Sequence, residues 1–457
     1  MTEAAVRATE LTRALSEYLS EAAATPLPPE VAEKGKHHVL DTLAAMVSGS
    51  RLKPGKMAIR YVRTQGGKRE ALVAGTRFLT SAVNAALANA MLAHADETDD
   101  SHAPSITHPG CAIVPAALAM GERHARGGEQ LLRAVVLGYD VCARITPALG
   151  INRLARADHS SHAIGSLWGA AAAAGAMAGL TAQQMRYLIS YTAQQTSGIA
   201  CWVRDEEHVE KAFDFGGMAA RNAVAAATMV DCGFTGVDDA LSGPHNLFAA
   251  YATDPRPETL AEELGQRFEI MATNIKRWPV GSPIQAALDA AMVLKAEHGI
   301  RAPDIERIVV KLPEDGARTV DNRHMPDINL QYLVAVTLLD GNLTFAASHD
   351  YRRMNDPKVL DMRGRIELLG DEELTRQRPS RQAIMEIFTR DGRSFKHRVL
   401  AVRGTADNPM PRKEVEEKAL DLLEPITGSA RAASLVDSVW NLERISDVRE
   451  LQALLQA

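Results

Sequence analysis

From its start to about residue 265, the chain repeats small and aliphatic residues at a helical period, and strand-like alternation is nearly absent. Val39, Leu43 and Val47 follow this period, and residues 82–93 and 131–145 continue it with many Ala and Gly residues. Aromatic residues make up only 5% of the chain, so the core must rest on Ala, Leu, Val, Met and Ile. This composition suits closely packed helices, and the pattern predicts an all-α domain.

The pattern changes after the proline-rich segment 254–257. Ile308, Val310 and Leu312 alternate with Val309 and Lys311, as expected for a half-buried strand. Asp391-Gly392 separates two further strand-like runs, 383–389 and 394–402, which indicates a hairpin. Helical stretches at 283–297 and 330–339 lie between these strands, so this part of the chain is expected to be α+β.

After Asn408-Pro409 the charged amphipathic helical pattern returns at 414–423 and 434–454. A C-terminal segment of this kind can pack back on the first domain. We therefore expect a mainly α fold, in which residues 1–267 and 403–457 form a large all-α domain. Residues 268–402 are expected to form a smaller α+β domain inserted into it.

The net charge of −6 and the absence of a polybasic tract argue against nucleic-acid and anionic-membrane partners. The four cysteines lie far apart and form no C-x-x-C pair, which disfavours a structural zinc site or a disulfide framework. The N-terminus lacks the order of a signal peptide, and the longest apolar stretch, 167–180, is too short to span a bilayer. These features predict a soluble cytoplasmic protein.

The densest group of ionisable residues lies between His94 and His108, with four carboxylates and three histidines at the end of one apolar helix. Pro109 predicts the start of the next helix, so His108 precedes a positive helix end that attracts anions. A polar surface loop that caps helices is the alternative. A metal site is a third interpretation, but the segment lacks the spacing of zinc-protease and calcium-loop motifs.

Three further segments could contact an anionic ligand. His159 and two serines precede the Ala-rich helix, where simple N-capping is the alternative. Lys211 is followed by Gly216-Gly217, and adjacent glycines permit close approach of the backbone to a ligand. Lys276-Arg277 stands before a Pro/Gly-rich turn and could neutralise substrate carboxylates, but on these residues alone a domain junction with solvated charges is the better interpretation. No phosphate-loop or dinucleotide-binding pattern occurs, so a nucleotide cofactor is not indicated.

Taken in order, these segments resemble the MmgE/PrpD family, which contains 2-methylcitrate dehydratase, cis-aconitate decarboxylase and iminodisuccinate epimerase. The similarity covers nearly the whole chain; the matching pieces are 41–43, 94–109, 159–165, 211–222, 276–289, 331–341, 403–404 and 408–409. The resemblance implies a homodimer with a large helical domain built from both chain ends and an inserted α+β lid. It also implies catalysis without a metal or an organic cofactor.

The resemblance also implies site residues. Those expected to be catalytic are His108, His159, Lys211, Glu97, Ser101 and Tyr332, and those expected to bind substrate are Lys276, Arg221, Gln285 and Asp100. Two departures from the family pattern are an extra residue between Ser101 and His108 and another between Lys211 and Ala219-Ala220. Gln285 stands where decarboxylase-like members carry a histidine, which disfavours cis-aconitate decarboxylation.

The chemistry shared by these relatives is proton transfer at a carbon beside a carboxylate, which requires imidazoles for acid–base work and cations that hold the developing enolate. The leading expectation is a lyase or isomerase acting on a small di- or tricarboxylate, nearest to 2-methylcitrate dehydratase. An iminodisuccinate-type epimerase and a cis-aconitate decarboxylase-like enzyme are alternatives. A non-catalytic small-acid binding protein is an alternative of another class.

The expected arrangement of the site is specific. His108 and His159 should face one cleft, with Lys211 close enough to neutralise a carboxylate and Tyr332 reaching in from the lid. His37 and His38 lie in an early helix outside the matching motifs and are expected to tolerate alanine.

Overall fold

The computed structural model describes residues 3–377 and 381–457, and the chain divides into two compact units. The helical unit comprises Met1–Ala95, Asp99–Asn274 and Val415–Ala457, and the sheet unit comprises Asp96–Thr98 and Ile275–Glu414. The mainly helical fold class with a small α+β part is confirmed. The sequence-based domain limits at 267/268 and 402/403 stay a prediction, which limited proteolysis of the purified chain can test.

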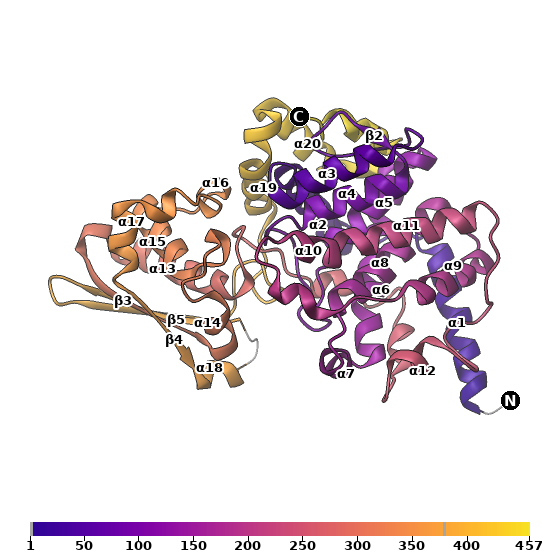
Figure 1. Cartoon of the computed structure of the whole chain (residues 1–457), viewed down its shortest axis with the longest axis horizontal. Coiled ribbons are helices and arrows are strands. Elements are labelled where there is room, and N and C mark those ends of the chain that lie inside the picture. The colour runs from indigo at the N-terminus through magenta and orange to yellow at the C-terminus, as the bar shows by residue number, and fades with distance from the viewer. Residues whose placement is uncertain (1–2, 378–380) are drawn as a thin grey trace. The chain divides into compact units, whose positions relative to one another are not determined.

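The helical unit is built from the helices that the apolar periodicity predicts (Figure 1). Its helices are α1 (Glu3–Glu21), α2 (Pro29–Gly49), α3 (Lys53–Gln65), α4 (Ala82–Ala93), α5 (Gly110–His124), α6 (Gly128–Leu149), α7 (Ile151–Arg156), α8 (Ser161–Ala178), α9 (Ala182–Gln195), α10 (Val209–Ala212), α11 (Met218–Asp231) and α12 (Leu247–Tyr251), with α19 (Arg412–Thr427) and α20 (Ser429–Trp440) from the C-terminal end. A short antiparallel pair, β1 (Ala71–Leu72) and β2 (Leu79–Thr80), precedes α4.

Helix α8 is the centre of this unit and packs against α5, α6 and α11 (Figure 1). Small residues allow that packing. A Cβ atom added at Gly169 would lie 2.5 Å from the carbonyl oxygen of Gly138 on α6, and one added at Gly138 would lie 2.9 Å from the carbonyl oxygen of Gly169. The two backbones therefore touch at a crossing that only glycine permits, and the Ala-rich stretch is an interior helix.

The sequence predicted the start of α9 correctly, but it did not predict the break in the C-terminal helical segment. Thr181 caps α9 as its sequence predicts, since its hydroxyl accepts from the N–H of Gln184, which completes a capping box. The single helix expected over 434–454 is wrong. Helix α20 ends at Trp440, and two 3₁₀ segments, Leu442–Arg444 and Val448–Ala453, follow it. Asp447 caps the second segment, which restarts the chain in a new direction.

The sheet unit contains a four-stranded mixed sheet in the order β4-β3-β5-β6. Its strands are β3 (Ile305–Pro313), β4 (Ile366–Asp371), β5 (Ala383–Thr389) and β6 (Ser394–Val399). Strands β5 and β6 form the predicted hairpin, and β3 pairs with β5 in antiparallel and with β4 in parallel orientation. The edge strand β4 was not predicted, because its short run shows only partial alternation of apolar and polar residues.

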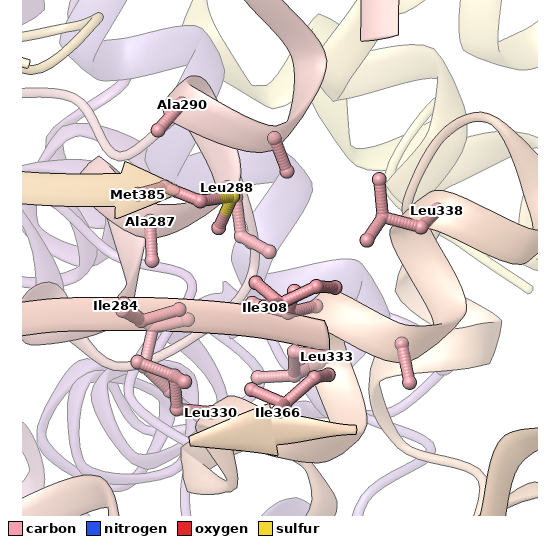
Figure 2. Packing of buried hydrophobic residues seen from close by; sticks show 14 of the residues in the cluster. Ile284, Ala287, Leu288, Ala290, Ile308, Leu330, Leu333, Leu338, Ile366 and Met385 are labelled. Carbon is pink, nitrogen blue, oxygen red and sulfur yellow. The ribbon is translucent and has the colours of Figure 1, made fainter. Parts of the chain in front are cut away.

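Helices cover one face of this sheet. The helices of the unit are α13 (Gln285–His298), α14 (Glu314–Val320), α15 (Leu330–Asp340), α16 (Phe345–Ser348), α17 (Pro357–Arg363) and α18 (Glu372–Arg376). Figure 2 shows the core in which Ile308 of β3 and Met385 of β5 meet Leu288 of α13 and Leu333 of α15, all buried. Ile308 is also the register partner of Ile366 on β4. This core gives the unit its own hydrophobic interior.

Across the described residues, no helix combines the length and the hydropathy that crossing a bilayer requires.

Candidate active site

The carboxylate of Asp99 joins two histidines at the end of α4. Helix α4 ends at Ala93 with His94 as its C-cap, and the ring nitrogen Nδ1 of His94 lies 2.8 Å from Oδ2 of Asp99. The same oxygen lies 3.3 Å from Nδ1 of His108, immediately before α5. Asp99 and His94 are fully buried, and His108 keeps 9% of its surface exposed. The carboxylate thus lies within ion-pair distance of His108, although the two do not meet in hydrogen-bond geometry. A carboxylate beside an imidazole is a common arrangement of an acid–base pair.

Three imidazoles surround one phenylalanine ring. His94 stacks on Phe215 with ring centroids 4.4 Å apart, and His162 stacks on it at 3.8 Å. The ring of His108 lies 5.3 Å from Phe215 and from His94, and 5.2 Å from His162. We call His94, His108, His162 and Phe215 the histidine cluster. It brings residues that are more than 100 positions apart into one group of rings.

A lysine adds positive charge to this group. Nζ of Lys211 lies 5.2 Å from the centroid of the Phe215 ring and 5.6 Å from that of Trp202. Both distances are within the range of a cation–π interaction. The rings therefore hold a positive charge at the edge of the histidine cluster, where it can attract a carboxylate.

A π-helical turn, Phe213–Gly217, joins α10 to α11 and carries Phe215. The family resemblance implies one extra residue between Lys211 and Ala219-Ala220, and a widened turn is the usual way for a helix to absorb one residue. The glycines expected to approach a ligand approach α4 instead: a Cβ at Gly216 would lie 2.6 Å from the carbonyl oxygen of Ala90, and one at Gly217 would lie 2.5 Å from Cγ of Met91.

Burial controls the charge of the cluster. It lowers the pKa of His94, although the charge of Asp99 opposes this, and it lowers the pKa of His162 well below the usual range. Positive charge on His108 and Lys211 adds to the effect on His162. His162 is therefore neutral at physiological pH.

Among the described residues, His94, Asp99 and Cys111 form a group in which ligand atoms lie within 4.8 Å of one another. The sulfur does not suit a metal. Its thiol donates to the carbonyl oxygen of His108 at 3.1 Å, and burial raises the pKa of Cys111 well above the usual range. A metal binds the thiolate, which this environment disfavours.

We therefore predict that a chelator leaves activity unchanged. The purified protein is dialysed against EDTA, and its turnover and metal content are compared with those of the untreated protein. Stoichiometric metal in the active protein, with activity lost in EDTA and restored by the metal, would overturn the prediction.

The structure places His162, rather than His159, beside His108. His159 is half-buried, and its ring lies 5.4 Å from the ring of Tyr251. Ser160 between them is the N-cap of α8, so the chain turns there, and only His162 lies on the helix. Sequence reasoning missed His162 as a site residue. The available signal was its position just inside the helix that follows the His159 motif.

Two expected substrate-binding residues have other contacts. Asp100 is fully buried and accepts hydrogen bonds from Nδ1 of His38 at 2.6 Å, the hydroxyl of Tyr139 at 2.5 Å and the N–H of Gly110 at 2.9 Å. Arg221 donates to the side-chain oxygen of its neighbour Asn222 at 2.9 Å. Arg221 also stacks over the ring of Phe213, and both residues line an apolar cavity of about 480 Å³. No residue of the histidine cluster lines this cavity.

Ser101 is half-buried, and its backbone forms an isolated antiparallel bridge with Asn274. The bridge holds one side of the loop that carries Asp99 and His108. The Ser101 hydroxyl remains a proposed substrate contact.

The remaining expected site residues lie in the sheet unit. Lys276 is buried, and its Nζ donates to the carbonyl oxygen of Glu97 at 2.8 Å and lies 3.5 Å from its carboxylate. Gln285 uses its side-chain amide to hold the turn at Trp278 through three hydrogen bonds to the backbone. The hydroxyl of Tyr332 donates to the carbonyl oxygen of Ala347 at 2.5 Å. Each has an observed contact within its own unit.

An ion pair between a half-buried histidine and a buried aspartate makes the stability of the sheet unit depend on pH. Nε2 of His349 lies 2.9 Å from Oδ2 of Asp96. Burial alone would lower the pKa of His349, but the hydrogen bond and charge of Asp96 raise it from 6.5 to about 9. A raised pKa stabilises the folded state fully below about pH 6.5, and this stabilisation is lost as the pH rises through about 9.

We therefore expect the free energy of unfolding to fall between pH 6.5 and pH 9. Urea denaturation at several pH values measures this fall. The His349→Gln variant should show a smaller fall over the same range. An equal fall in both proteins would mean that the pair does not contribute.

Comparison with known proteins shows which family the chain belongs to. The MmgE/PrpD N-terminal domain matches residues 13–260, and the MmgE/PrpD C-terminal domain matches residues 278–443. The chain belongs to the MmgE/PrpD family. It is 23% identical to a cis-aconitate decarboxylase-like protein of Aspergillus oryzae over 97% of both chains. It is 22% identical to the cis-aconitate decarboxylase of Aspergillus terreus over 97% of this chain and 96% of that one.

A third relative of this MmgE/PrpD chain matches over a shorter region. The chain is 36% identical to the 2-methylcitrate dehydratase of Cupriavidus necator over 123 residues, which is 24% of this chain and 25% of that protein.

Proposed function

We propose that this MmgE/PrpD protein is a lyase that decarboxylates a small polycarboxylate of the cis-aconitate type. Relatives with cis-aconitate decarboxylase names align with almost the whole chain, whereas the match to a 2-methylcitrate dehydratase covers 24% of it. This supports the decarboxylase alternative over the dehydratase that the motifs favoured. The departure at Gln285 carries less weight than expected, because its amide is used to hold a turn.

The observation that carries the proposal is the carboxylate of Asp99 beside His108, with Lys211 at the edge of the same cluster. In a decarboxylation, the bond to the departing carboxylate breaks, CO₂ leaves, and the electron pair stays on the conjugated carbon framework. His108 then donates a proton to carbon and recovers one from water. Lys211 attracts a remaining carboxylate, and Asp99 lies 3.3 Å from Nδ1 of the His108 that transfers the proton.

Dehydration of 2-methylcitrate is the second candidate, because the partial relative has the higher identity, 36%. That reaction uses the same base to remove a proton from carbon, and it needs an acid that protonates the departing hydroxyl.

The family resemblance also implies a homodimer, which is part of this proposal. Light scattering of the purified protein tests it.

A proton NMR screen in D₂O tests the proposed function. Wild-type protein and the His108→Ala variant are incubated separately with cis-aconitate, 2-methylcitrate, citrate and an aminodicarboxylate. We expect the wild type to consume cis-aconitate, release CO₂ and incorporate deuterium at one carbon, and the variant to be much slower. Loss of water from 2-methylcitrate would identify a dehydratase, and deuterium exchange without net conversion would identify an epimerase. Binding without any conversion would identify a non-catalytic protein.

A further inference from the structure

His162 lies at the first turn of α8, a helix whose start is capped independently of this histidine. The hydroxyl of Ser160 accepts from the N–H of Ala163 at 3.3 Å and donates to Asp214 at 2.5 Å. The side chain of His162 is therefore not needed for capping. It lies at the positive end of an 18-residue helix, next to His108.

The orientation of the His162 ring is set by its neighbours. Its plane is 13° from that of Phe215 at a centroid distance of 3.8 Å, and it meets Trp202 edge-on at 5.5 Å. Contacts on the face and at the edge leave the ring little freedom to rotate. The ring is held in place before any ligand binds.

The two nitrogens of this ring have different surroundings. Nδ1 of His162 is buried and has no hydrogen-bond partner within the described part of the chain, while the residue as a whole is partly exposed. Nε2 is not among the buried side-chain atoms that lack a partner within the described residues, so it is the ring nitrogen that a ligand can reach. A proton on the buried Nδ1 would be an unsatisfied donor, so the neutral ring is expected to carry its proton on Nε2.

We propose that His162 contacts the substrate and donates a hydrogen bond from Nε2 to a substrate carboxylate while His108 transfers the proton. The inference rests on the proposed function and adds a residue to it. A neutral imidazole at a helix N-terminus can act as a fixed donor toward an oxyanion. Such a donor, aimed where negative charge develops, contributes to the rate without changing its own protonation state.

The tautomer is tested first, by ¹⁵N NMR of the full-length protein labelled at histidine, between pH 5.5 and pH 8. The His162→Phe spectrum assigns the signals. We expect His162 to remain neutral over this range with its proton on Nε2. A proton on Nδ1, or an imidazolium form at pH 6.5, would overturn the proposal.

The contact is tested by binding of tricarballylate, a saturated tricarboxylate that cannot react. Calorimetry is performed on the wild type, His162→Phe, His162→Gln and the control His298→Phe. The control removes a histidine that stacks on Phe395 at 4.4 Å in the sheet unit, so it matches the change but lies outside the cluster. We expect Kd to rise at least about tenfold in His162→Phe, less in His162→Gln, and to be unchanged in the control.

Activity adds a second readout. Removal of one oxyanion donor lowers kcat by roughly 10²–10³-fold, and we expect this loss in His162→Phe with the pH profile of the wild type. Binding and kcat unchanged in His162→Phe would overturn this inference alone. No binding of any carboxylate to the wild type would overturn the proposed function and this inference together.

Discussion

Replacing His108 with alanine is expected to lower kcat by roughly 10²–10⁴-fold, the usual range for loss of a general acid–base group. The reason is the position of the ring: Asp99 lies 3.3 Å from Nδ1 of His108, and Lys211 lies at the edge of the same cluster. The fold should survive, because His108 lies in a loop before α5. Turnover measured by NMR, together with circular dichroism and the Tm, separates the two effects.

A matched control for this experiment is His298→Ala, which removes an exposed histidine of the sheet unit. It should leave kcat unchanged. His38 cannot serve as a control, contrary to the sequence-based expectation, because its ring is buried and bonded to Asp100. His37 is also mostly buried and packs against Trp440. Wild-type turnover in His108→Ala would exclude His108 as the acid–base group.

Replacing Asp100 with alanine is expected to lower the free energy of unfolding by at least about 3 kcal/mol, since three buried donors would lose their acceptor at about 1–3 kcal/mol each. The donors are His38, Tyr139 and the N–H of Gly110, all within 2.9 Å of the carboxylate. Although burial opposes it, hydrogen bonding from His38 and Tyr139 lowers the pKa of Asp100, so the carboxylate is ionised and accepts from all three. Chemical denaturation measures the loss.

This prediction separates a structural from a substrate-binding role for Asp100. A structural role predicts a large loss of stability for Asp100→Ala and a smaller one for Asp100→Asn, which keeps one carbonyl acceptor. A substrate-binding role predicts an increase in KM with stability unchanged. The control is Asp238→Ala, whose exposed carboxylate pairs with Arg186 and should cost less than about 0.5 kcal/mol.

The local structure of this protein follows from its sequence to a large extent. A helical period of small and aliphatic residues predicted the helices of the first unit, and Thr181 and Asp391-Gly392 predicted a helix start and a hairpin that the structure contains. These signals are local, because capping and tight turns depend on residues only a few positions apart. The break after Trp440 and the edge strand β4 depend on weaker signals and were missed.

The sequence also determined the family and most of the segments that carry the site, because several separate motifs occur in the right order. It did not determine which side chains meet. The contact of His108 with His162 and Phe215 exists because α5, α8 and the turn before α11 pack closely through glycine and alanine. That closeness is set by the crossing of helices far apart in the chain, and no local spacing encodes it. Only the tertiary structure could select His162 over His159 as the neighbour of His108, and only it shows that Asp100 is bonded within the fold.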